Sequence, residues 1–111
     1  MSDDTVLPPF FNLNFTYMKN AKFINPCDIN MFHFGHEDVL NNNDEKETRR
    51  HKLERAMIIS NCDHVPINIY MCLPNGETLE TESDVVDYAD DVVLLKGGYF
   101  IPVWAILDVD V

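Results

Sequence analysis

Hydrophobic and polar positions alternate in several short stretches of the chain, which is the pattern of β-strands with one buried face. The alternation is clearest at 12–17 and returns at 78–82. A further strand is predicted at 29–34, where aromatic residues share one face and Gly35 ends the stretch. These stretches predict a sheet whose strands are half-buried.

One part of the chain has the composition of a helix instead. Residues 45–57 follow several N-cap candidates at 41–44, and their acidic members precede their basic ones, which suits the helix dipole. Glu45 and Arg49 have the spacing and order of a favourable ion pair within a helix. The apolar stripe is narrow, so we expect the first two turns to be solvated. The end of the helix stays open, because 57–59 could equally begin a strand.

Two hairpins are predicted in the second half of the chain. Residues 65–73 are rich in β-formers and are followed at 74–76 by the proline and glycine of a tight turn. Residues 92–95 lead through two consecutive glycines into the apolar stretch 99–109. Pro102 cannot donate a hydrogen bond to a neighbouring strand, so the last strand should lie at an edge or contain a bulge there.

The predicted fold class is therefore α+β, a single domain with a largely antiparallel β-sheet of about five or six strands and one main α-helix. The 111-residue chain has the length of one domain, and we assign 10–111 to it. Residues 1–9 are expected to form a flexible N-terminal lead-in that ends at two consecutive prolines.

Composition favours a folded intracellular protein. The chain is 46% hydrophobic, enough to form a core despite its net charge of -11. Its acidic N-terminus lacks the features of a signal peptide, and its apolar runs are too short to span a membrane as a helix. Cys27, Cys62 and Cys72 do not form a disulfide pattern. We expect the cytoplasm or nucleus, a reducing compartment, and no membrane contact.

Histidines and cysteines offer weak candidates for chemistry. His33, His36, Cys62 and His64 could in principle ligate a metal, but no recognised zinc spacing is present. Cys62 and His64 would share a face if they lay on a strand, which would suit a cysteine nucleophile. We predict no metal, no cofactor and no catalytic residue. A small metal-dependent or Cys/His-dependent enzyme remains the second alternative.

Charge is distributed unevenly along the chain. A basic surface is expected on the helix, formed by Lys46, Arg49, Arg50, Lys52 and Arg55. An acidic segment without any base follows later, formed by Glu77, Glu80, Glu82, Asp84, Asp87, Asp90 and Asp91. The simpler interpretation is that the basic surface and the acidic segment only keep the protein soluble. The more specific one is that the acidic segment binds a partner, with Glu80, Glu82 and Asp84 in one row along a strand.

These expectations lead to a function hypothesis. The chain is expected to be a non-enzymatic acidic binding protein, an inhibitor or regulator that engages a basic protein or a nucleic-acid-binding protein. Only in size and charge is it similar to small acidic inhibitors of nucleic-acid enzymes, often phage or viral, which mimic DNA. Direct binding of nucleic acid is not expected. The alternative is a structural or assembly subunit that self-associates as a homodimer or larger homo-oligomer.

Overall fold

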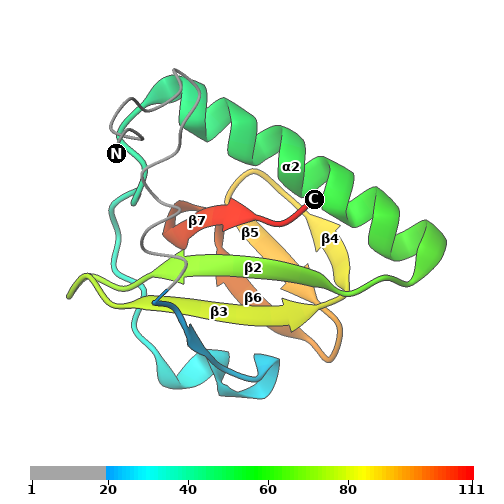
Figure 1. Cartoon of the computed structure of the whole chain (residues 1–111), viewed down its shortest axis with the longest axis horizontal. Helices are drawn as coiled ribbons and strands as arrows, with labels where there is room; N and C mark the ends of the chain where they lie inside the picture. The colour runs from blue at the N-terminus through cyan, green and yellow to red at the C-terminus, as the bar shows by residue number, and fades with distance from the viewer. Residues whose placement is uncertain (1–19) are drawn as a thin grey trace, which may run out of the picture.

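The computed structural model describes residues 20–111, and within them the chain forms seven strands, one long helix and two 3-10 helices (Figure 1). In chain order these are β1 (Lys22–Phe23), η1 (Pro26–Met31), α2 (Asn43–Asp63), β2 (Ile67–Cys72), β3 (Thr78–Ser83), β4 (Val85–Tyr88), β5 (Val92–Leu95), β6 (Tyr99–Pro102), η2 (Val103–Ala105) and β7 (Ile106–Val109). The predicted α+β class and single main helix are confirmed. The strand predicted at 12–17 and the lead-in at 1–9 lie outside the described residues.

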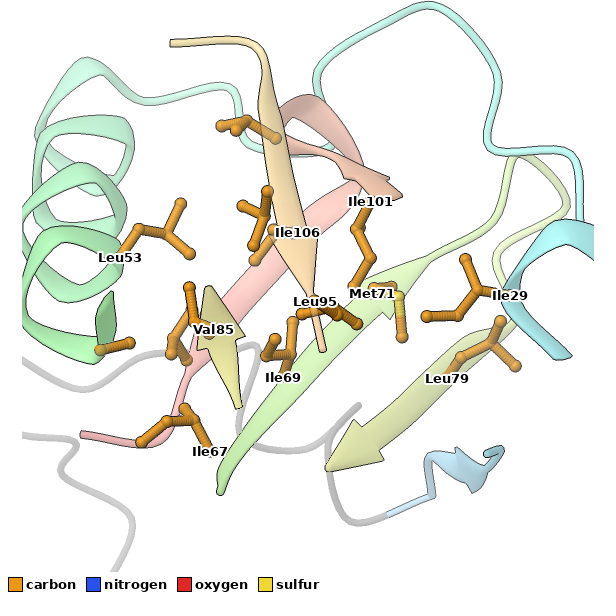
Figure 2. Packing of buried hydrophobic residues seen from close by; sticks show 14 of the residues in the cluster. Ile29, Leu53, Ile67, Ile69, Met71, Leu79, Val85, Leu95, Ile101 and Ile106 are labelled. Atoms are coloured by element: carbon orange, nitrogen blue, oxygen red, sulfur yellow. The ribbon is translucent and has the colours of Figure 1, made fainter. Parts of the chain in front are cut away.

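The strands form two sheets that pack against each other. The first has the order β1-β3-β2-β7, and the second has the order β4-β5-β6. Every pairing is antiparallel except that of β1 with β3. In Figure 1 the second sheet lies behind the first, and in Figure 2 buried side chains from both meet between them. The core is therefore the layer between the inner faces of the two sheets.

Two helical elements close the sides of this sandwich. Helix α2 contacts β4 and β7, which are edge strands of different sheets, and inserts the fully buried Leu53 between them. On the other side, η1 contacts β6 and β3 and places Ile29 beside Met71 and Leu79 (Figure 2). Each element thus seals one gap between the sheets against water.

The limits of α2 follow from its flanking residues. The side chain of Asn42 accepts hydrogen bonds from the backbone N–H groups of Asp44 and Glu45, at 2.7 and 3.3 Å. The helix continues through 57–59 and ends at His64, which has the left-handed φ of 56°. Of the two alternatives for 57–59, helix or the start of a strand, the structure shows helix. One face of this last part of α2 packs on the core.

The strand predicted at 29–34 is wrong. Residues Pro26–Met31 form a 3-10 helix, in which the backbone N–H of Asp28 donates to the carbonyl of Asn25 at 2.9 Å. Proline suits the first turn of a helix because its φ is fixed and it needs no acceptor. The helical turn directs Ile29 into the core, where its side chain is almost fully buried.

The continuous strand predicted at 99–109 is also wrong, although both predicted hairpin turns form. Gly97 and Gly98 have φ of 96° and 89°, as the turn between β5 and β6 requires. Pro102 ends β6 at the edge of the second sheet, as its missing N–H allows. The turn η2 then carries the chain to β7 in the first sheet, so one apolar stretch supplies edge strands to both sheets.

Candidate acidic interface

The outer face of the first sheet carries carboxylates from two strands that are far apart in the sequence. Tyr70 at the centre of this face pairs with Glu80 on β3 and with Asp108 on β7. The three form one row across the sheet, because directly opposed residues of antiparallel strands share a face.

A second row runs parallel to the first. Asn68 pairs with Glu82 on one side, and its carbonyl accepts from the backbone N–H of Asp110 on the other, at 2.9 Å. The inner face of the same strand is fully buried at Ile69 and Met71, which is why Asn68 and Tyr70 point outward. We call Glu80, Glu82, Asp108 and Asp110 the acidic interface.

The electrostatics of this face are visible at its central tyrosine. Partial burial raises the pKa of Tyr70, and the nearby carboxylates of Glu80, Asp110 and Asp108 raise it further. The field around the phenol is therefore negative. One cation reaches the group, because Lys52 Nζ lies 2.8 Å from Asp108 Oδ1. Glu80, Glu82 and Asp110 take part in no ion pair among the described residues.

The spacing of the two rows can be compared with that of phosphates. Same-face residues along a strand lie about 6.6 Å apart, and strands lie about 4.8 Å apart. Four carboxylates thus occupy a patch about 7 by 10 Å. Over about 7 Å of its axis, duplex DNA carries about four charges. With one negative charge offset by Lys52, the acidic interface carries about three negative charges over the same length, all on one face of the sheet.

The structure divides the predicted acidic segment among several places. Glu80 and Glu82 lie on the outer face of β3, whereas Glu77 lies in the hairpin turn, where its N–H donates to Asn75 Oδ1. Asp84 lies at the corner where the chain passes from the first sheet to the second, so the strand that holds the predicted row ends before it. Asp87, Asp90 and Asp91 belong to the second sheet and form a separate exposed group on β4 and the turn after it.

The expected basic surface on α2 is largely neutralised within the protein. Arg49 is only 6% exposed and forms an ion pair with Asp38. Arg50 pairs with Glu47 and, at 3.0 Å, with Glu54. Lys52 is occupied by Asp108. Lys46 and Arg55 take part in none of the ion pairs among residues 20–111. The prediction that Arg49 belongs to a charged surface is wrong.

Arg49 instead joins three parts of the fold. Its Nη1 and Nη2 donate to the two carboxylate oxygens of Asp38 at 2.9 and 2.7 Å, and Nη1 also donates to the Ile106 carbonyl at 3.0 Å. Burial raises the pKa of Asp38, but the hydrogen bonds from Arg49 and from the Leu40 N–H outweigh this, so the pKa lies below its ordinary value. The predicted Glu45–Arg49 pair is therefore replaced by a long-range pair.

The candidate metal ligands are not brought together. His33 and His36 lie in the loop before α2, with ring centroids 5.7 Å apart, whereas Cys62 and His64 lie at the far end of the helix (Figure 1). Over residues 20–111, no group of three or more His, Cys, Asp or Glu side chains could hold a metal ion. Cys62 is in the helix, so the strand geometry considered for a Cys62–His64 pair is wrong.

A shallow pocket of about 480 Å³ lies between this loop and the first hairpin. Its lining includes Phe34, His36, Glu37, Cys72 and Pro74. Burial raises the pKa of the Cys72 thiol, which lies 3.4 Å from the Leu73 carbonyl as a hydrogen-bond donor. A thiol held protonated in this way is a poor nucleophile.

Asp108, Asp110 and Tyr70 are the members of this face that sequence reasoning did not select. Asp108 and Asp110 alternate with Val109 at the end of the chain, so a strand with two outward carboxylates was the available signal. That signal does not tell which strand would lie beside these two aspartates.

No helix in the part of the chain that the structure describes is long and apolar enough to cross a membrane. Comparisons with protein-family models, with curated proteins and with solved structures give no match for this chain.

Proposed function

We propose that this chain is a non-enzymatic binding protein whose acidic interface engages a basic site on a partner protein, as an inhibitor or regulator does. The observation that carries the proposal is the pair of carboxylate rows on the outer face of the first sheet, in which Lys52 pairs with Asp108 alone among the four carboxylates. Carboxylates placed side by side on a rigid sheet repel each other, and a cationic partner relieves that repulsion.

The kind of partner follows from the geometry. The density of charge on the interface is close to that of a nucleic-acid backbone, so a groove that normally holds phosphates fits it well. Tyr70 adds an aromatic surface on which an arginine side chain can stack. We therefore propose a nucleic-acid-binding protein, with the acidic interface occupying the site of the nucleic acid.

The test compares two variants that each lose two exposed carboxylates. Glu82→Gln with Asp110→Asn removes charge from the acidic interface, whereas Glu37→Gln with Asp63→Asn removes the same charge elsewhere. Wild type and both variants are immobilised, and proteins captured from extracts of the native cells are quantified at about 0.05 M and about 0.5 M salt.

We expect at least one basic protein to be retained by the wild type and the control, and to be retained about tenfold less by the interface variant. High salt should release it, and duplex DNA should compete with the wild type for the purified partner. A partner that is held equally by all three proteins and is indifferent to salt would refute the proposal.

A further inference from the structure

The outer face of the second sheet is apolar, unlike that of the first. Leu94 on β5 lies directly opposite Phe100 on β6, and Val92 lies opposite Pro102. These four side chains share one face, because Val93, Leu95 and Ile101, which alternate with them, are fully buried in the core. The two sheets pack by their inner faces, so this apolar face lies on the opposite side of the molecule from the acidic interface.

Solvent reaches this face. Phe100 is 54% exposed, and Val86, at the irregularity of β4, is 43% exposed. Leu94 and Val92 remain partly exposed even though they lie on the central strand of the sheet. An aromatic side chain and three aliphatic neighbours on one face of the sheet form the apolar centre of a contact surface.

Acidic side chains line one side of the apolar centre. Asp87 on β4 pairs with Leu94 and so extends the row that runs across to Phe100. Asp90 and Asp91 lie in the turn that leads into Val92, and all three aspartates are exposed. The face thus changes from negative at β4 to apolar at β6.

This charge pattern decides which occupant fits. A second copy of the chain would bring apolar side chains together, but it would also bring two molecules of net charge -11 into contact. Lys96 lies at the other end of the hairpin, and its single positive charge does not neutralise the negative charges of three aspartates. A segment with apolar side chains on one part and Arg or Lys on another satisfies both halves of the face.

We infer that the outer face of β4–β5–β6 is a second docking surface, which takes a basic, amphipathic segment of a partner protein. The apolar side chains of that segment cover Leu94 and Phe100, and its cations face Asp87, Asp90 and Asp91. This inference is independent of the acidic interface, because the two surfaces lie on different sheets and face away from each other.

The test uses three synthetic peptides of about twelve residues. One alternates leucine with arginine, one alternates serine with arginine, and one alternates leucine with glutamate. Binding is followed by amide chemical shifts of the labelled full chain. The leucine–arginine peptide should shift the amides of β4, β5 and β6, and the other two should bind about tenfold more weakly or not at all.

Two matched variants assign the site. Phe23 on β1 has the same 54% exposure as Phe100 but belongs to the first sheet. Phe100→Ser should lower the affinity for the leucine–arginine peptide about tenfold, and Phe23→Ser should change that affinity by less than about twofold. Asp87→Asn with Asp90→Asn should lower the affinity and its dependence on salt.

Three results would overturn the inference. The first is binding that Phe100→Ser leaves unchanged. The second is a set of shifts centred on Tyr70 and Glu80, which would move the binding to the acidic interface and leave the proposed function intact. The third is a wild-type dimer in sedimentation that Phe100→Ser dissociates, which would make a second copy the occupant of this face.

Discussion

The contact between Arg49 and Asp38 gives the sharpest prediction for stability. Replacing Arg49 with Met keeps much of the side-chain volume but removes three hydrogen bonds, two to the Asp38 carboxylate and one to the Ile106 carbonyl. Removing one partner of a buried ion pair costs about 3–5 kcal/mol. Asp38 is 24% exposed, so water can solvate part of its freed charge, and we expect a loss of about 2–4 kcal/mol.

The assay is urea unfolding at about pH 7 and about pH 3. The folded pKa of Asp38 is depressed, so its contribution to stability is complete above its unfolded pKa and is lost as pH falls through the folded pKa. Acid should therefore reduce the free energy of unfolding more in the wild type than in Arg49→Met. The other carboxylates titrate in both proteins and largely cancel in the comparison.

Arg55→Met is the control, because Arg55 is exposed and takes part in no ion pair among residues 20–111. It should change the free energy of unfolding by less than about 0.5 kcal/mol. If Arg49→Met behaves like this control at both pH values, the bidentate pair does not stabilise the fold and the reasoning is refuted.

Three further measurements test other contacts. Ser60→Ala should cost about 1–3 kcal/mol in urea unfolding, because the hydroxyl accepts from a buried backbone N–H of β4 at 3.0 Å; an unchanged midpoint would contradict this. Leu53→Ala should cost about 2–5 kcal/mol, whereas Ile58→Ala, on the solvent side of α2, should cost much less; equal losses would contradict the packing. Cys72 should react with a thiol reagent more slowly than the exposed Cys62 near neutral pH, because burial raises its pKa and limits access.

Local signals predicted the elements that depend on neighbouring residues. The N-cap side chain, the order of charges along the helix and the glycines of both hairpins act over a few residues, and the structure contains each of these elements. The strand at 29–34 failed for the opposite reason. Its alternation was compatible with a sheet, but the segment folds as a 3-10 turn that contacts β3 and β6 and buries Ile29.

The same division applies to the candidate sites. Glu80 and Glu82 could be selected from the sequence because they alternate with buried positions on one strand. The burial of Arg49 could not be predicted in this way. It depends on Asp38 and Ile106, which come close to Arg49 only when the loop and β7 pack on the helix.

By itself, the sequence determined the α+β class, the helix, the hairpins and the acidity of the chain, because periodicity, capping and turn chemistry act within one element. Tertiary structure decided which elements meet. It divided one apolar stretch between two sheets, brought Asp108 and Asp110 beside Glu80 and Glu82, and neutralised most of the basic helix. The physical reason is that burial of apolar surface and pairing of charges are satisfied only between segments that lie far apart in the chain.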